Sequence, residues 1–146
     1  EGKAAWVIGT VQWTTIGDSM IICHFLERLL GFTLNPKHAE MINIVTGFNY
    51  KFEELVDVAE RILDLERAFN VRTGIRRKDD TLPRRFLEEP IPEGPSKGMH
   101  TDEQTLNKML DDFYTLKGWN KITGIPTKEK LIRIGLEDVA KELEKL

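Results

Sequence analysis

One short stretch, Asp-Ser-Met-Ile-Ile-Cys-His-Phe at residues 18–25, concentrates side chains that can bind a metal or a cofactor. Cys23 is the single cysteine of the 146 residues, and it follows Asp18 by five positions. A thiolate binds soft metals and iron–sulfur clusters, but one thiolate cannot complete such a site alone. A lone cysteine among apolar residues is also typical of a small core residue. The pattern alone therefore leaves Cys23 either a core residue or a ligand whose partners lie elsewhere.

The other motifs favour structural roles. The three histidines lack the spacing that places two ligands on one helix face, so we expect no histidine metal site; they are His24, His38 and His100. No glycine-rich elbow surrounds a serine or the cysteine, which argues against a hydrolase. The arginine-rich segment 71–85 contains carboxylates and no interleaved aromatic residues, so we interpret it as solvated or carboxylate-paired. Residues 127–146 have a helix-turn-helix outline, but the acidic second helix argues against DNA binding.

Composition limits the protein class. A chain of 146 residues with 40% hydrophobic residues is long enough for one compact domain. The formal charge of -3 predicts no general attraction to nucleic acid or to an anionic membrane, and no apolar run is long enough to span a bilayer. A single cysteine requires no oxidising compartment, so we expect a soluble cytoplasmic protein. Because the first residue is Glu1 rather than Met, we expect a piece of a longer polypeptide.

The elements that position residues 18–25 are predicted to be helices. Apolar residues are so dense from Lys3 to about Leu30 that we expect mostly helix, covered on several sides and ending near Gly31. Asn35-Pro36 predicts the start of a shorter helix through Val45. Apolar residues then recur every three or four positions over 52–69, which indicates an amphipathic helix with Asn49 as its cap.

The second half is predicted to be helical as well, after an interruption. Residues 81–100 hold four of the six prolines, which indicates an extended strap. A capping box at Thr101 predicts a helix ending near Gly118, and Thr127 begins another, which Gly135 divides before helix resumes to the C-terminus. The predicted fold class is therefore all-α: an irregular domain of about five to seven helices with a Pro-rich extended strap.

Three sequence elements, in order, carry a family resemblance. Residues 18–23 correspond to D-x-x-G-L-C, with Asp18 and Cys23 identical and Ile22 at the position of Leu. Residues 69–85 match F-N-x-R-x-G and then D-D-x-L-P-x-R, and residues 114–127 match Y-x-x-(R/K)-G-W and then G-I-P-T. Together they span about 110 residues. In this order they resemble the C-terminal helical region of the tungsten-containing aldehyde:ferredoxin oxidoreductase family.

The resemblance implies a role for the first element. Residues 1–146 would be a C-terminal helical domain, similar to domain 3, of an enzyme that oxidises aldehydes to carboxylates. Cys23 would be the last of four cysteine ligands of a 4Fe-4S cluster, with the other three in an upstream C-x-x-C-x-x-x-C that this chain lacks. Asp18 would bind a tungsten or molybdenum bis-pterin through pterin N–H donors. Ile22, with its apolar neighbours, would keep water from these cofactors.

Partners and activity follow from the same resemblance. The N-terminal domains of the same polypeptide and ferredoxin would be the partners, and a homodimer is compatible with the sequence. We expect no catalytic residue in this chain, and no activity or cofactor in the isolated chain. The alternative is a stand-alone helical interaction module with no redox role, in which Cys23 is a core residue. Which aldehyde and which metal are left open.

Ile21 departs from the family pattern, which has glycine at that position. Glycine readily adopts left-handed backbone dihedrals, whereas a β-branched residue strongly disfavours them. We therefore expect Ile21 to lack the backbone freedom that glycine has there.

Overall fold

The computed structural model describes residues 2–29 and 33–146, and the regular structure in these ranges is helical. In chain order the elements are α1 (Lys3–Ser19), α2 (His24–Leu29), α3 (Pro36–Thr46), α4 (Phe52–Arg72), the 3-10 helix η1 (Arg77–Asp79), α5 (Arg84–Glu88), α6 (Glu103–Lys117), α7 (Lys128–Arg133) and α8 (Glu137–Leu143). The all-α prediction is confirmed. The α-helices of the described ranges exceed the predicted five to seven because α2 and α5 are separate helices of only 6 and 5 residues.

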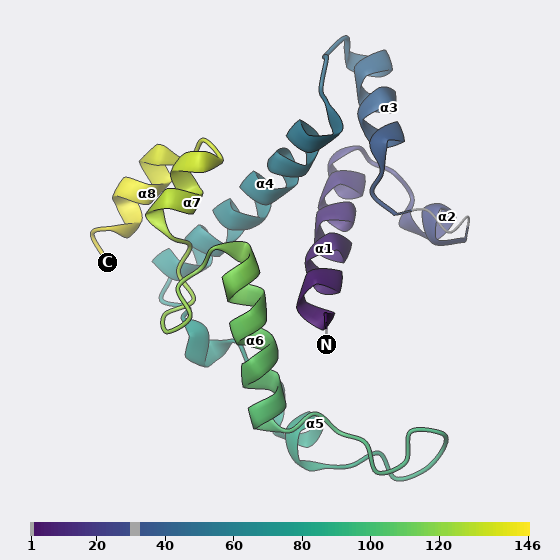
Figure 1. Ribbon diagram of the computed structural model, residues 1–146, viewed down its shortest axis with the longest axis vertical. Coiled ribbons are helices and arrows are strands. Elements are labelled where there is room, and N and C mark those ends of the chain that lie inside the picture. The colour runs from purple at the N-terminus through teal and green to yellow at the C-terminus, as the bar shows by residue number, and fades with distance from the viewer. Residues whose placement is uncertain (1, 30–32) are drawn as a thin grey trace.

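The long helix α4 organises the fold (Figure 1). Helix α1 packs against both α4 and α6, and α3 packs against α4. Helices α7 and α8 pack against each other, and α8 also contacts α4. In Figure 1, α2 and α3 lie to the right of α4, and α7 and α8 lie to its left. The C-terminal end of α1 therefore leads directly into the α2 and α3 side of the molecule.

A small apolar core holds α1, α3 and α4 together. It is formed by Ile16 of α1, Ala39 of α3, and Leu55 and Ala59 of α4, each of them at most 4% exposed. The two alanines let the helix backbones approach closely, and each buried Ile or Leu side chain contributes about 1.5–3 kcal/mol relative to an exposed one. This core fixes the last turns of α1.

The first predicted helix is divided. Gly9 and Gly17 lie inside α1 without interrupting it, but the helix ends at Ser19 and α2 begins only at His24. The prediction of mostly helix from Lys3 to about Leu30 is confirmed for the described residues, with an interruption at residues 20–23, where the chain turns. The predicted helix end near Gly31 lies outside the described residues.

The predicted helix start at Asn35-Pro36 and the predicted cap Thr127 are confirmed, whereas the predicted caps Asn49 and Thr101 are wrong. Asn35 Oδ1 accepts from the Lys37 amide at 2.9 Å, and Thr127 Oγ1 accepts from the Lys130 amide at 3.3 Å. The N-cap residue of α4 is Lys51 rather than Asn49, and the N-cap residue of α6 is Asp102 rather than Thr101. Asp102 outcompetes Thr101 because a carboxylate oxygen can accept the free amide of Thr105, at 2.7 Å, with a full charge.

The Pro-rich segment is only partly extended. Helix α5 lies inside the predicted strap of residues 81–100, and the remainder closes on itself, since the Ile91 amide donates to the Met99 carbonyl at 3.0 Å and the Gly98 amide donates to Ile91 at 2.8 Å. Residues 88–100 are all exposed. The segment projects past the lower end of α6 in Figure 1.

Candidate functional site

Residues 18–23, here called the cysteine turn, end α1 in a tight backbone reversal. The Ile21 amide donates to the Asp18 carbonyl at 3.2 Å, and the Ile22 amide donates to the Gly17 carbonyl at 2.9 Å. This is the pattern of a helix that ends on a left-handed residue, a position usually occupied by glycine. Ile21 occupies it here, with φ of 59°. The expectation that Ile21 would lack this conformation is therefore wrong.

The turn keeps the left-handed conformation because the surrounding hydrogen bonds fix it. The β-branched side chain of Ile21 gains nothing from packing, since the residue is 93% exposed. A left-handed L-residue costs about 1–2 kcal/mol relative to the right-handed conformation. The cysteine turn therefore carries strain at Ile21, where the D-x-x-G-L-C pattern of the resembled family has glycine.

Replacing Ile21 by glycine should stabilise the 146-residue chain. Glycine removes the left-handed strain, and the loss of an exposed side chain costs almost no packing, so we expect the free energy of unfolding to rise by about 1 kcal/mol. Urea denaturation followed by circular dichroism measures this change. Ile21→Ala retains a Cβ and should give a smaller gain. A loss of stability in Ile21→Gly would show that the turn is not strained.

Cys23 is exposed, at the entrance to α2. Its carbonyl accepts from the amides of Leu26 and Glu27 at 3.0 and 3.2 Å, which fixes the backbone while the thiol faces outward. Ile22 beside it is half-buried, whereas Phe25 is 87% exposed. The interpretation of Cys23 as a core residue of this chain is therefore wrong, because the residue is exposed.

Asp18 lies on the last turn of α1, and its side chain is 70% exposed. Its Oδ1 lies 3.0 Å from His24 Nε2, so the first residue of α2 is tied back to the end of α1. The predicted site residues Asp18, Ile22 and Cys23 thus belong to one turn, with a carboxylate and a thiol both open to solvent. Among residues 2–29 and 33–146, no group of three His, Cys, Asp or Glu side chains is arranged to hold a metal ion.

The second and third sequence elements meet away from this turn. Arg67 of α4 forms a double hydrogen bond with Asp80 through Nη1 at 2.9 Å and Nη2 at 2.6 Å, and its Nε donates to the Gly124 carbonyl at 2.8 Å. The Tyr114 hydroxyl also donates to Asp80. Burial and the neighbouring Asp80 raise the pKa of Tyr114 above its usual range. These two elements therefore join α4, η1 and α6.

The arginine-rich segment is paired with carboxylates, as the sequence predicts. Arg77 Nη1 lies 2.6 Å from Asp111, and Arg84 contacts Glu88 at 2.9 Å. Such pairs neutralise part of the positive charge of the segment.

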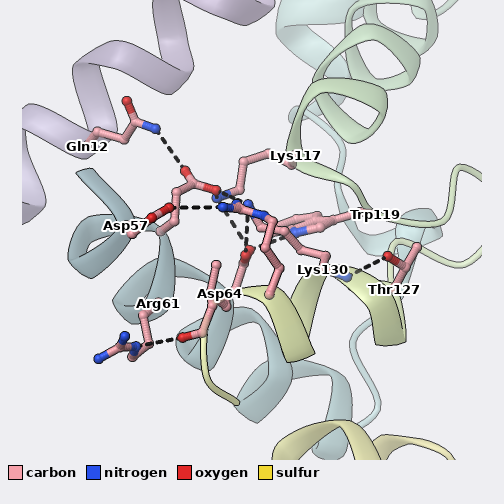
Figure 2. Close-up of polar contacts among 11 residues, drawn as sticks. Gln12, Asp57, Arg61, Asp64, Lys117, Trp119, Thr127 and Lys130 are labelled. Carbon is pink, nitrogen blue, oxygen red and sulfur yellow. Dashed lines mark hydrogen bonds and ion pairs between the residues drawn. The ribbon is translucent and has the colours of Figure 1, made fainter. Parts of the chain in front are cut away.

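A buried ion network lies where α1, α4, α6 and α7 meet (Figure 2), formed by Glu60, Asp64, Lys117 and Lys130. Lys117 Nζ lies 2.8 Å from Glu60 and 3.3 Å from Asp64, and Lys130 contacts the same two carboxylates. Trp119 donates to Asp64 at 2.8 Å, and Gln12 of α1 donates to Glu60 at 2.9 Å. The network thereby fixes the orientation of α1, the helix that carries the cysteine turn.

Sequence reasoning missed this network. The two carboxylates stand four residues apart on α4, and Asp64 is fully buried. Acidic residues one turn apart on an otherwise apolar helix face are a usable signal, because a buried carboxylate requires a cationic partner. The lysine partners lie too far along the chain for local patterns to identify.

Acid should weaken the fold through Glu60. Burial would raise the pKa of this carboxyl, but hydrogen bonds from Lys117, Lys130 and Gln12 outweigh burial and lower its pKa from 4.5 to about 2. Because the pKa of Glu60 is lower in the folded chain, the ionised carboxylate contributes its full stabilisation above about pH 4.5. That contribution to the free energy of unfolding is lost as the pH falls towards 2. The loss is on the order of 3 kcal/mol.

Urea denaturation between pH 6 and pH 2.5 tests this expectation. Asp80 also has a lowered pKa, because its hydrogen bonds to Arg67 and Tyr114 outweigh its burial, so it contributes in the same direction. The free energy of unfolding is plotted against pH for the wild type and for Glu60→Gln. The difference between the two curves gives the contribution of Glu60 to the pH dependence. Parallel curves for the two proteins would show that Glu60 does not cause the loss of stability in acid.

No helix in the described ranges is both long enough and apolar enough to cross a bilayer.

Comparison with known proteins identifies relatives over nearly the whole chain. A family model described as "Aldehyde ferredoxin oxidoreductase, domains 2 & 3" matches residues 1–136. The tungsten-containing aldehyde ferredoxin oxidoreductase of Pyrococcus furiosus is 40% identical over 139 residues, which cover 94% of this chain and 22% of that protein. The aliphatic sulfonate oxidoreductase, WOR-like subunit, of the same organism is 32% identical over 135 residues, or 88% of this chain and 21% of that protein.

A solved structure has the same fold. The active site complex BamBC of benzoyl coenzyme A reductase, in complex with 1,5-dienoyl-CoA, matches with a TM-score of 0.67 and 27% identity, over 97% of this chain and 21% of that chain. The chain spans about a fifth of the length of the curated relatives that it matches.

Proposed function

The chain belongs to the aldehyde ferredoxin oxidoreductase family, and from that membership we propose that it covers a metal–pterin cofactor and supplies one ligand of an iron–sulfur cluster. The parent enzyme would oxidise an aldehyde to a carboxylate and pass the electrons through the cluster to ferredoxin. The observation that carries this proposal is the exposure of the single cysteine at a fixed turn.

The cysteine turn suits one ligand of a shared cluster. An iron–sulfur cluster needs several thiolates, so a chain with one cysteine can contribute only together with residues of another segment. The exposed thiol of Cys23 is free to meet such a segment, whereas a core cysteine would not be. Ile22 and Phe25 beside it would exclude water once the site is covered, and burial is one of the factors that set a cluster potential.

Asp18 is the candidate pterin ligand. Its open carboxylate can accept the adjacent ring and amino N–H groups of a pterin, and the contact with His24 Nε2 at 3.0 Å limits its rotation. The metal–pterin centre, when bound, supplies the two-electron chemistry. In this proposal the chain itself holds the pterin and one corner of the cluster, and contributes no acid or base.

The α2 and α3 side offers an apolar surface for the rest of such an enzyme. Four side chains there are more than 80% exposed, namely Phe25, Leu29, Ile44 and Val45. Large exposed apolar side chains that gather on one side of a protein usually mark an interface. We propose that the N-terminal domains of the parent polypeptide and the cofactors cover it.

The test is a chimera in which this chain replaces the matching segment of the Pyrococcus furiosus enzyme. We expect the chimera to retain tungsten and iron, and the 146-residue chain alone to bind neither in stoichiometric amount. Asp18→Asn should lower the tungsten content measured by mass spectrometry, and Asp18→Ala should lower it further, because an unpaired buried donor costs about 1–3 kcal/mol. Iron should stay near the level of the unsubstituted chimera. Equal tungsten in the three proteins would show that Asp18 does not hold the pterin.

A further inference from the structure

The short helix that follows Cys23 is attached to the body by a carboxylate. Helix α2 has six residues, and Glu27 alone among them is buried, with 6% of its surface exposed. Its apolar residues point outward, Phe25 and Leu29 being more than 80% exposed. Hydrophobic burial therefore cannot hold α2 in place, and the polar contacts of Glu27 must do so.

Both oxygens of Glu27 are occupied by donors from other helices. Trp13 Nε1 of α1 donates to Oε2 at 3.0 Å, and His38 Nε2 of α3 lies 2.7 Å from Oε1. Because a carboxylate oxygen can only accept, Nε2 carries the proton that His38 donates to Glu27, while Nδ1 lies 3.3 Å from the Asn35 amide and 3.2 Å from the Asn35 carbonyl. One buried carboxylate thus joins α1, α2 and α3.

His24 extends this contact to the cysteine turn. Its Nδ1 lies 3.3 Å from Glu27 Oε2 but makes no hydrogen bond there, whereas its Nε2 lies at hydrogen-bond distance, 3.0 Å, from Asp18 Oδ1. The ring packs edge-on against Trp13, with centroids 5.3 Å apart, and a Cβ at Gly17 would overlap it. Gly17 is therefore the residue that makes room for His24 on α1.

We propose that Glu27 is a positioning residue that holds Cys23 and Asp18 in the arrangement that receives the cluster and the pterin. The inference rests on the function proposed above. Glu27 fixes α2, whose start includes the backbone of Cys23. It thereby also places His24, the first residue of α2, beside Asp18. Ligands held in advance by supporting hydrogen bonds bind their cofactors without a further ordering cost.

The first experiment needs no cofactor. Amide hydrogen exchange of the 146-residue chain is followed in peptides covering residues 20–29 and the α4 segment 55–69. Glu27→Gln places an amide donor against the existing donors, so we expect exchange in 20–29 to accelerate at least about tenfold, with α4 within about twofold of wild type. The control, Glu40→Gln, changes an exposed carboxylate on α3 and should alter neither segment. Unchanged exchange in 20–29, or equal acceleration in both segments, would overturn the proposal.

A second pair of variants tests the same arrangement without changing a charge. Gly17→Ala should displace His24 and accelerate exchange in residues 20–29, although alanine normally favours a helix. Gly9→Ala is the matched control, since a Cβ there meets nothing within 4 Å, and it should leave 20–29 unchanged. Identical behaviour of the two alanine variants would contradict the role of His24.

The chimera supplies the readout at the cofactor. In the reduced protein, Glu27→Gln should broaden or shift the paramagnetic signal of the cluster and should speed its loss to a chelator several-fold, because Cys23 is held less firmly. Cys23→Ala in the same chimera separates the two claims. If Cys23→Ala keeps the full cluster signal, the proposed function fails. If Cys23→Ala loses the signal while Glu27→Gln matches the wild type in signal and in chelator resistance, only the inference about Glu27 fails.

Discussion

Replacing Lys117 by methionine should destabilise the 146-residue chain by about 3–5 kcal/mol. The Lys117 side chain is only 2% exposed and is shared between Glu60 and Asp64. Methionine fills similar volume but leaves two buried carboxylates facing the single ammonium of Lys130. The uncompensated charge, rather than lost packing, is the cause of the expected loss. Urea denaturation at pH 7 measures it.

Two further variants identify the cause. Lys117→Met combined with Glu60→Gln leaves one carboxylate and one ammonium in the network, so the double variant should lose less stability than the sum of the two single variants. Arg133→Met breaks an ion pair with Asp57 in which both side chains are about half exposed, and it should stay close to wild type. Strict additivity in the double variant, or equal losses in Lys117→Met and Arg133→Met, would contradict the account of the network.

Local patterns in the sequence predicted the helices well where helix ends carry their own signals. Asn35 followed by Pro36 and the hydroxyl of Thr127 satisfy free amides directly, so the starts of α3 and α7 could be predicted. The cap of α6 was misplaced by one residue because Thr101 and Asp102 are adjacent and both can cap. Which of the two residues caps the helix depends on which side chain reaches the free amide of Thr105, and local sequence patterns do not show this.

The division of the first helix could not be predicted from apolar density. That density indicated burial within this chain, yet the structure leaves Ile21 and Phe25 more than 85% exposed. The density is explained if these side chains are covered by the rest of a larger enzyme, as proposed above. The left-handed conformation of Ile21 was missed for a different reason, since the hydrogen bonds of the turn outweigh the preference of the residue.

The partners within the buried polar clusters could not be predicted from the sequence either. Glu27 meets Trp13 and His38, and Glu60 meets Lys117, which is 57 positions away along the chain. Polar residues at buried positions break the apolar periodicity on which helix prediction depends, so they resemble surface residues until their partners are known. The family resemblance named residues 18–23 as a site but gave no account of what supports them.

Cys23→Ala in the chimera should remove the cluster. A cluster iron that loses its thiolate finds no second thiolate in this sequence to replace it, because Cys23 is the single cysteine. The pterin metal has a separate set of ligands, so tungsten should stay close to the level of the unsubstituted chimera. The loss is therefore expected to be selective, which distinguishes it from a general failure to fold.

The reduced-cluster paramagnetic signal, measured per tungsten atom in chimeras purified anaerobically side by side, tests the central claim most directly. The account predicts that Cys23→Ala falls below about a tenth of the signal of the unsubstituted chimera, with tungsten nearly unchanged. A signal and iron content equal to those of the unsubstituted chimera would show that Cys23 is not a cluster ligand, and would contradict the function proposed for this chain.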